Sequence, residues 1–301
     1  MPKRVLIIGG YGNFGSYIAR ALAKHPDIQL IIAGRSKDKA TAFVTTLEAV
    51  HTPEVATFDV HTEIEASLKH IKPYLTIHTS GPYQAQDHFV AKACISQACH
   101  YIDLADARAF VESIYSLDSE AKDQNVSVIS GASSVPGLSS CILDVYQSYF
   151  KELQSVDYGI TTAQHINRGL ATTEAILSYA GKPFTTLQEG KMQKVYGWQS
   201  LNSRKFWKVG RRLLANCDVP DLALFPERYP TLKTHRFYAG IELSFLHLGF
   251  WGLTWFVRAG LFKNLARWSA SLLKVYKLFD WFGSDVSAFY MCMRGTDRDG
   301  K

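Results

Sequence analysis

Short apolar runs alternate with helix-like segments through the first 130 residues. Each run is four or five residues long and rich in Val, Ile and Leu, as is typical of strands buried on both faces of a sheet. The runs are residues 5–8, 29–33, 55–58, 75–79, 101–104 and 126–130. The segments between them carry apolar residues at helical spacing. This alternation predicts an α/β fold built on a doubly wound parallel sheet.

The first predicted strand runs directly into a glycine-rich turn. Gly10, Gly12 and Gly15 fit the pattern G-x-G-x-x-G, and the order strand, glycine turn, helix gives that pattern its weight. The glycines of such a Rossmann turn permit a tight bend, a close approach of pyrophosphate and close packing of the helix, whose N-terminus faces the phosphates. The sequence therefore predicts a dinucleotide site formed by Gly9, Gly10, Tyr11, Gly12, Asn13, Phe14 and Gly15.

A basic turn follows the second predicted strand. Sites that prefer NAD place an acidic residue near this point, where it accepts a hydrogen bond from the ribose 2′-OH. Here Arg35, Ser36 and Lys39 offer a guanidinium, a hydroxyl and an ammonium group, which suit a 2′-phosphate. We therefore predict NADP(H) rather than NAD(H) as the cofactor. The alternative interpretation is a solvated basic turn.

The loop after the fourth predicted strand is the next candidate for cofactor contact. Loops at the carboxyl ends of parallel strands line the cofactor crevice of this architecture. We accordingly predict that Ser80, Gly81 and Pro82 contact the cofactor. Tyr83 is a candidate proton carrier beside the nicotinamide, or else a ring that only walls the cofactor.

Acidic residues end two other predicted strands. Asp59 follows the third strand, where it either contacts the adenine or caps a helix. Asp106 lies just beyond the fifth strand and is, with Tyr83, the preferred proton carrier, the alternative being a turn or cap residue. Asp103 is a lower-ranked candidate for the same role.

The second half begins with a predicted strand over residues 155–162, and a polar cluster follows it. In this cluster His165 is a further candidate proton carrier, and Arg168 is a candidate to hold a substrate carboxylate through two hydrogen bonds. The alternative is a loop solvated at the surface.

An ordered set of short motifs runs through the first 150 residues. The motifs are Gly9-Gly10-Tyr11-Gly12 with Gly15, Ala33-Gly34-Arg35, Ser80-Gly81-Pro82-Tyr83, Tyr101-Ile102-Asp103-Leu104 and Val135-Pro136-Gly137. Together they resemble the saccharopine dehydrogenase/saccharopine reductase-like NADP-binding family. The resemblance implies a Rossmann domain over residues 1–150 and an α+β domain over residues 151–301, which supplies substrate contacts and often a dimer interface, here that of a homodimer.

Two function classes follow from these observations. The preferred one is an NADP(H)-dependent oxidoreductase that transfers a hydride between the nicotinamide and a carbonyl or imine carbon of a small substrate, with amino-acid-derived compounds among the candidates. The alternative is a non-catalytic NADP(H)-binding module held at a membrane or a protein partner, because a glycine turn indicates binding and not chemistry.

Two other catalytic motifs do not fit the chain. The spacing Tyr-x-x-x-Lys occurs at Tyr229 and Lys233, but Pro230 lies between them and argues against pairing on one helix turn. Residues 131–135 fall one residue short of G-x-S-x-G, which argues against a serine hydrolase.

Cysteine usage bears on compartment and metals. The five cysteines are an odd and scattered set, which favours reduced thiols and a cytoplasmic location over a disulfide framework. Cys94, Cys99 and His100 lie close together without a second ligand pair, so we predict no metal site. We also expect no signal peptide, because charged Lys3 and Arg4 lead directly into a strand.

Positive charge is concentrated in the second half. Residues 151–301 hold 21 Lys and Arg against 12 Asp and Glu, whereas the first 150 residues carry a net charge of −3. Such an excess suits anionic substrates, a membrane surface or nucleic acid, but no nucleic-acid-binding motif accompanies it. We therefore expect a small-molecule substrate and no nucleic acid as partners.

The segment 245–282 combines this charge with aromatic residues. Residues 243–257 contain no charged side chain, but they are fewer than the roughly 18–20 apolar residues of a membrane-spanning helix. A helical pattern over residues 259–282 then has basic residues on one face and, on the other, Leu261, Leu265, Trp268, Leu272, Tyr276 and Phe279. We expect this face to pack on its own domain or a second subunit, the alternative being a peripheral membrane contact.

The end of the chain carries a final signal. Residues 291–295 indicate a strand and residues 296–300 a hairpin turn. Members of the family continue past such a point, so we expect the second domain to be C-terminally truncated.

Overall fold

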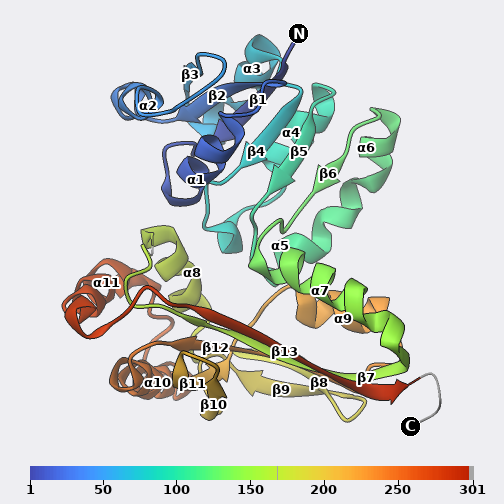
Figure 1. Ribbon diagram of the computed structural model, residues 1–301, viewed down its shortest axis with the longest axis vertical. Coiled ribbons are helices and arrows are strands. Elements are labelled where there is room, and N and C mark those ends of the chain that lie inside the picture. Colours follow the sequence, from blue (N-terminus) through green and yellow to red (C-terminus); the bar gives the residue numbers. More distant parts are fainter. Residues whose placement is uncertain (168, 298–301) are drawn as a thin grey trace. The chain divides into compact units, whose positions relative to one another are not determined.

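The computed structural model describes residues 1–167 and 169–297, and the chain divides into a first unit over Met1–Gly137 and a second that begins at Leu138 (Figure 1). The division comes earlier than residue 150. Helix α7 (Ser139–Tyr146) belongs to the second unit, because its first residue is buried there and the Ser139 hydroxyl donates to Asp221 at 2.5 Å.

Within the described residues the first unit contains a six-stranded parallel sheet in the order β3-β2-β1-β4-β5-β6. This is the Rossmann order, and it confirms the predicted fold class. The strands are β1 (Lys3–Ile8), β2 (Ile28–Gly34), β3 (Glu54–Thr57), β4 (Leu75–His78), β5 (His100–Asp103) and β6 (Val128–Ile129). The helices are α1 (Asn13–Leu22), α2 (Lys37–Val44), α3 (Val60–Ile71), α4 (Phe89–Ser96), α5 (Arg108–Ser113) and α6 (Asp118–Asp123).

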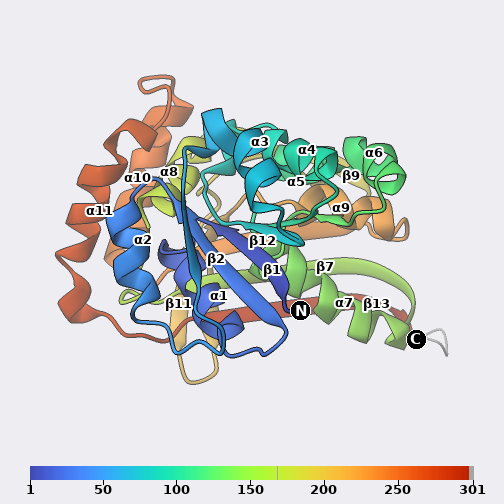
Figure 2. The same ribbon diagram turned by 90° about the horizontal axis from the view of Figure 1, so that it is seen from above.

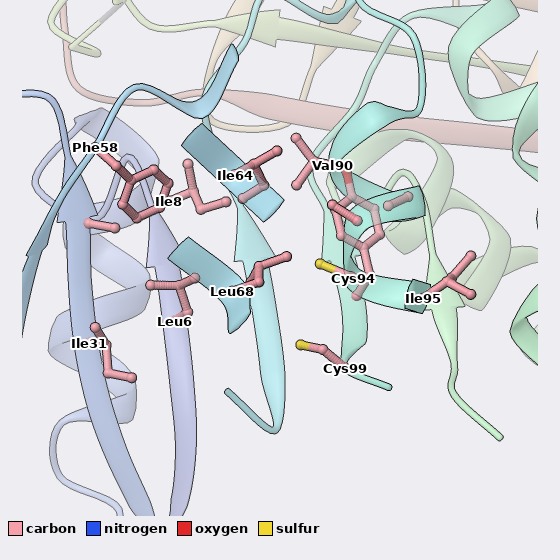
Figure 3. Packing of buried hydrophobic residues seen from close by; sticks show 14 of the residues in the cluster. Leu6, Ile8, Ile31, Phe58, Ile64, Leu68, Val90, Cys94, Ile95 and Cys99 are labelled. Atoms are coloured by element: carbon pink, nitrogen blue, oxygen red, sulfur yellow. The ribbon is translucent and has the colours of Figure 1, made fainter. Parts of the chain in front are cut away.

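Alternate residues of the central strands point to opposite faces of this sheet. Leu6 of β1 and Ile31 of β2 pack with α3 and α4, as the close view of this core shows (Figure 3). Ile7 and Ile32, one residue further along each strand, pack with α1 and α2 on the other face. Because helices cover both faces of the sheet, side chains on both sides of each strand are buried. The strands therefore appear in the sequence as continuous apolar runs.

The second unit is built on a mixed sheet. Its described strands follow the order β10-β11-β12-β7-β13, and β8 pairs with both β12 and β9. The strands are β7 (Phe150–Thr162), β8 (Pro183–Gln188), β9 (Lys191–Tyr196), β10 (Asn202–Phe206), β11 (Gly210–Asn216), β12 (Thr234–Ile241) and β13 (Ala288–Asp297). The further helices are α8 (Leu170–Tyr179), α9 (Asp221–Arg228), α10 (Ser244–Arg258) and α11 (Ser269–Lys277). Figure 2 shows α10 and α11 beside α8 at one end of this unit.

Two sequence-based expectations for this unit are corrected. The helical pattern over residues 259–282 is interrupted, because Gly260 adopts a φ of +79° and ends α10. The Leu261 N–H then donates to Phe256 O at 2.9 Å and the Gly260 N–H to Val257 O at 3.0 Å, which is the Schellman arrangement. At the chain end, Thr296 and Asp297 continue β13 instead of opening a hairpin turn, whose remaining residues lie outside the described part. No helix in the described part of the chain is both long and apolar enough to cross a lipid bilayer.

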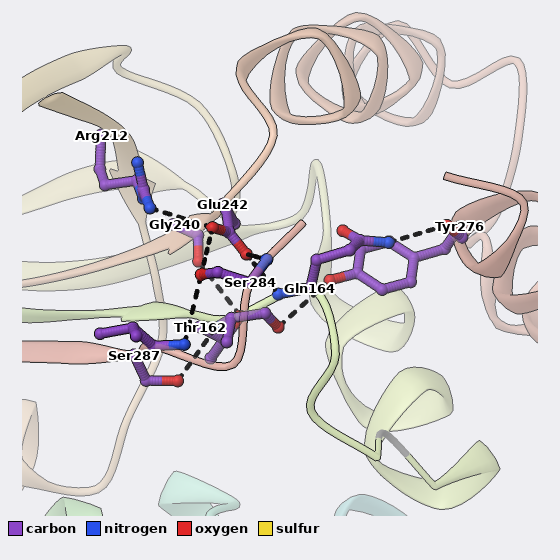
Figure 4. Close-up of polar contacts among 10 residues, drawn as sticks. Thr162, Gln164, Arg212, Gly240, Glu242, Tyr276, Ser284 and Ser287 are labelled. Carbon is purple, nitrogen blue, oxygen red and sulfur yellow. Dashed lines mark hydrogen bonds and ion pairs between the residues drawn. The ribbon is translucent and has the colours of Figure 1, made fainter. Parts of the chain in front are cut away.

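Glu242 connects four segments of the second unit (Figure 4). It follows β12, and its carboxylate accepts hydrogen bonds from Arg212 at 3.1 Å, from the Gln164 N–H at 2.7 Å and from the Ser284 hydroxyl and N–H at 2.6 and 2.9 Å. Burial opposes ionisation of Glu242, but these hydrogen bonds and the charge of Arg212 outweigh it and lower its pKa. The side chains of Arg212 and Glu242 are only 15% and 9% exposed, so this ion pair is shielded from water.

We expect Glu242→Gln to lower the free energy of unfolding by about 3 kcal/mol, because it leaves the Arg212 guanidinium without its counter-charge in a mostly buried site. Urea unfolding of the full chain, followed by circular dichroism, measures this loss. The matched control is Glu54→Gln, whose ion pair with Arg4 joins side chains that are 45% and 40% exposed. That control should cost less than about 1 kcal/mol, and an equal loss in both variants would contradict the role assigned to Glu242.

Candidate cofactor site

The turn between β1 and α1 is held by backbone hydrogen bonds to the neighbouring strand β2. The N–H groups of Gly9 and Gly10 donate to Ala33 O at 2.9 and 3.2 Å, and the Gly12 N–H donates to Gly9 O at 2.8 Å. Gly9 has a φ of +78°, which an L side chain rarely adopts. Gly9, one residue before the first glycine of the G-x-G-x-x-G motif, is therefore the position whose backbone conformation requires glycine.

The last glycine of the motif lets α1 pack closely on this turn. A Cβ at Gly15 would overlap the carbonyl oxygen of Gly9 and lie 2.8 Å from the Cα of Gly10. Gly12 is exposed and is the N-cap of α1, and it makes no side-chain cap hydrogen bond at the start of the helix. The N–H groups and the positive dipole end of α1 are thus accessible to a phosphate.

The end of β4 packs against the same turn. Both the N–H and the hydroxyl of Thr79 donate to Ile8 O, at 3.0 and 2.8 Å, and a Cβ at Gly9 would lie 2.7 Å from the Ser80 hydroxyl. The Gln86 amide donates to the carbonyls of Ser80 and Pro82 at 2.8 and 3.1 Å. The structure therefore brings Ser80 to the glycine turn, with Gly81 and Pro82 in the loop that follows. Thr79 and Gln86 were not predicted; their only sequence signal is their place beside this strand end.

Tyr11 connects the glycine turn to the basic turn. Its hydroxyl accepts a hydrogen bond from the Ser36 N–H at 3.0 Å, and its ring lies where a Cβ on Gly34 would be only 2.5 Å away. Ser36 in turn caps α2, since its hydroxyl accepts from the Lys39 N–H at 3.4 Å. Arg35 and Lys39 are exposed on this turn. The two predicted groups of cofactor residues are therefore next to each other.

Asp59 has a local structural role. Its carboxylate accepts from the His61 N–H at 2.9 Å, and its own N–H donates to the carboxylate of Glu63 at 2.8 Å. These two bonds cap the start of α3. Of the two interpretations of Asp59, the structure favours the helix cap over the adenine contact.

Tyr83 is buried, and its hydroxyl donates to the backbone carbonyl of His78 at 2.7 Å. Burial is the main reason that the pKa of Tyr83 is raised, and the charges of Asp103 and Asp106 raise it further. A hydroxyl used in this way, and held protonated, is poorly suited to exchange a proton with a substrate. The catalytic role of Tyr83 stays a prediction, and this geometry weighs against it.

Asp103 and Asp106 differ in accessibility although they lie three residues apart. Asp103 is fully buried, and its carboxylate accepts from the N–H groups of Ala105 and Gly131, each at 2.9 Å, and from the Ser130 hydroxyl at 3.0 Å. Burial raises the pKa of Asp103, while these hydrogen bonds oppose the shift. Asp103 therefore holds β5 to the loop after β6.

Asp106 is exposed and accepts a hydrogen bond from the Gln84 amide at 3.2 Å. Desolvation by the surrounding protein nevertheless raises the pKa of its carboxyl, and the hydrogen bond from Gln84 opposes the shift. Among the predicted proton carriers in the described part of the first unit, Asp106 is the exposed residue.

The second predicted cluster is held to the segment that precedes β13. The ring of His165 is exposed, with Nε2 2.8 Å from the Asp280 carbonyl oxygen, and its N–H donates to the Ser284 carbonyl at 3.0 Å. The neighbouring Gln164 amide donates to the Tyr276 carbonyl at 2.9 Å (Figure 4). His165 thus has a structural contact within the second unit, and its catalytic role stays a prediction. Arg168 lies outside the described residues.

His78, at the end of β4, is a buried titratable group that was not predicted. It is 1% exposed; its Nδ1 lies 3.1 Å from the Tyr101 hydroxyl, and its Nε2 has no hydrogen-bond partner among the described residues. Burial lowers the pKa of His78 to about 4. The folded state therefore excludes a proton that the unfolded chain binds below its ordinary pKa of about 6.5.

We expect the stability of the protein to fall as the pH is lowered from about 6.5 toward 4, because only the unfolded state protonates His78 in this window. In His78→Gln this contribution is absent. Urea midpoints of both proteins at pH 7 and pH 4.5 measure the difference, with the wild type losing about 2 kcal/mol more than the variant. His247, whose pKa burial also lowers to about 4, is present in both proteins and cancels. An equal loss of stability between pH 7 and pH 4.5 in the two proteins would contradict the role assigned to His78.

Comparison with known proteins agrees with this geometry. Residues 5–129 match the family described as the saccharopine dehydrogenase NADP binding domain. Apo saccharopine dehydrogenase (L-Glu forming) from Saccharomyces cerevisiae superimposes with a TM-score of 0.60 at 16% identity, over 79% of this chain and 55% of that chain. An amine dehydrogenase from Mycobacterium smegmatis gives a TM-score of 0.47 at 10% identity, over 80% and 79% of the two chains. No curated protein matches the sequence.

These comparisons differ in what they establish. At 16% identity the likeness to the yeast structure shows a shared fold, and this chain spans about half of that protein's length. The family match covers the strands and turns described above, and an uncapped helix N-terminus beside an exposed basic turn fits a phosphorylated dinucleotide. Residues 5–129 therefore form a domain that matches the saccharopine dehydrogenase NADP binding domain, and the cofactor is NADP(H).

Proposed function

We propose that the protein is an NADP(H)-dependent oxidoreductase that transfers a hydride between the nicotinamide and a carbonyl or imine carbon of a small, amino-acid-derived substrate. The observation that carries the proposal is the contact between the glycine turn and the basic turn through Tyr11 and Ser36, within a matched NADP binding domain. The name of the yeast structure, a saccharopine dehydrogenase that forms L-Glu, supports the substrate class.

In this proposal, different residues of the first unit bind the cofactor and supply the proton. The glycine turn and the N-terminus of α1 bind the pyrophosphate, and Arg35 with Lys39 binds the 2′-phosphate. The nicotinamide, when bound, supplies or accepts the hydride. A carbonyl or imine that gains a hydride also needs a proton at its heteroatom, and Asp106 is the proposed donor. Its raised pKa favours the protonated carboxyl that such a donor requires.

Arg35 is proposed to select the phosphorylated cofactor. We expect Arg35→Ala to raise the Kd for NADPH about 10-fold or more, because it removes a charge-assisted hydrogen bond to the 2′-phosphate, and to leave the Kd for NADH within about twofold. Isothermal titration calorimetry measures both constants.

In Lys69→Ala, a control on the exposed surface of α3, neither dissociation constant should change. Gly15→Val should weaken both cofactors alike, since its side chain would displace α1 from the turn. Equal affinity of the wild type for NADPH and NADH would contradict the role of Arg35.

Asp106 is proposed to supply the proton. A screen of keto acids, imines and amino acids, followed by NADPH absorbance, identifies a substrate. On that substrate we expect Asp106→Asn to lower kcat about 100-fold without changing the Kd for NADPH, as is typical for loss of a general acid. Tyr83→Phe is the matched variant and should retain turnover, because its hydroxyl already binds the His78 carbonyl.

Unchanged turnover in Asp106→Asn would remove this residue from the mechanism. Tight binding of NADPH with no turnover on any substrate of the screen would favour the alternative function, a non-catalytic NADP(H)-binding module.

A further inference from the structure

The second unit carries an exposed apolar face on α10, on α11 and on the residues that follow them. Its largest members are Phe245, Trp255, Phe256, Leu278, Trp281 and Phe282, with exposed fractions from 43% to 91%. On α10, Phe245, Trp255 and Phe256 share one side of the helix by their spacing. We call these residues, together with the basic residues named below, the α10–α11 face. So many large apolar side chains exposed on one segment are unusual on a protein exposed only to water.

This face is distinct from the apolar stripe that the sequence pattern predicts. Leu265 of that stripe is 1% exposed, and its N–H donates to the Leu177 carbonyl of α8. Leu272 and Tyr276 line a cavity of the same unit. These three residues of the stripe therefore pack on their own unit, whereas Leu261 is 67% exposed. The residues of the α10–α11 face form an additional apolar set.

The charge around this face is predominantly positive, with Asp280 between Phe279 and Trp281 as the acidic residue within it. From Leu243 to Phe279 the chain contains no Asp or Glu, and it contains five basic residues, all exposed: Arg258, Lys263, Arg267, Lys274 and Lys277. The guanidinium of Arg258 lies 4.9 Å from the centre of the Trp255 ring, and that of Arg267 lies 4.1 Å from the centre of the Trp268 ring. Aromatic rings interleaved with cations are typical of elements that lie at the boundary between lipid headgroups and acyl chains.

A cavity of about 260 Å³ opens at the same face. Phe245 of α10 and Val275 of α11 both line it, and each is 49% exposed, so they mark its mouth. Its interior is almost entirely apolar, with Leu246 and Phe250 from α10 and Leu272 from α11 among its walls. Such a cavity can accept part of an acyl chain, which a lipid offers and a folded protein surface does not.

We propose that the α10–α11 face binds an anionic lipid surface, with Trp281, Phe282 and Leu278 inserted at the headgroup level and the five basic residues against the lipid charges. The sign of the charge decides between this occupant and a second copy of the chain. A twofold interface would bring two sets of the same five cations together, with only Asp280 of residues 243–282 on each copy to offset them. An anionic membrane, in contrast, attracts each of them.

Co-sedimentation of the full chain with vesicles tests the proposal. Vesicles of phosphatidylcholine containing about 30% phosphatidylserine should bind at least about 10-fold more protein than vesicles of phosphatidylcholine alone, and raising the salt from about 0.1 to 0.5 M should weaken binding. Lys274→Glu with Lys277→Glu, and Leu278→Ser with Trp281→Ser, should each reduce binding at least about 10-fold.

Matched controls alter the same unit elsewhere. Lys151→Glu with Lys191→Glu makes the same change in charge at exposed positions, and Trp207→Ser removes another exposed tryptophan. These controls should bind vesicles as the wild type does. Urea midpoints confirm that each variant is folded, and the assay contains no NADPH, so its result is independent of the proposed reaction.

Three outcomes would overturn the proposal. The first is equal binding to both kinds of vesicle, and the second is an equal loss in the controls and the test variants. The third is a dimer, in sedimentation equilibrium, that Leu278→Ser with Trp281→Ser converts to a monomer while vesicle binding is absent. That result would assign the face to a second copy of the chain.

Discussion

The carbonyl oxygen of Gly9 is the point at which α1 packs against the glycine turn. It accepts the Gly12 N–H at 2.8 Å, and α1 approaches it so closely that Gly15 has no room for a side chain. The neighbouring strands hold the same turn from two sides, since Ala33 of β2 accepts from Gly9 and Gly10 and Thr79 after β4 donates to Ile8. The order β2-β1-β4 thereby fixes the N-terminus of α1, where we propose that the pyrophosphate binds. The proposed site depends on this close packing.

Most elements of the first unit could be predicted from the sequence, because the signal for each strand lies within the strand itself. Strands covered on both faces need continuous apolar residues, so six short runs were sufficient to predict six strands. The second unit was less predictable because its key contacts are remote in sequence. Glu242 binds Arg212, Ser284 and Gln164, which are 30, 42 and 78 residues away. No periodic pattern reports such contacts, and the left-handed backbone at Gly260 that ends α10 is equally invisible in a helical pattern.

Contacts that the sequence does not reveal also limited the prediction of the candidate site. Sequence reasoning placed Tyr83, Asp59 and Asp106 near the carboxyl edge of the sheet, but it does not show which polar atoms are already engaged there. Tyr83 bonds the His78 carbonyl and Asp59 caps α3, whereas Asp106 is an exposed residue. These differences arise from hydrogen bonds to nearby backbone groups, and a single residue of displacement along a loop would change them. A chemically suitable residue at the right strand end is therefore necessary for a catalytic role and is not sufficient.

The hydrogen bond from Ser36 to Tyr11 links the glycine turn to the basic turn, the two loops proposed to bind the pyrophosphate and the 2′-phosphate. The conformational entropy of these linked loops is lost when the chain folds, before any ligand arrives, and so it is not subtracted from the affinity. Because Gly34 has no side chain, the ring of Tyr11 can pass over it to reach the Ser36 N–H. In the proposed site, selectivity for the phosphorylated coenzyme depends on preorganisation of the basic turn as well as on its charge. A mutation that frees this turn would then weaken discrimination while every basic residue stays in place.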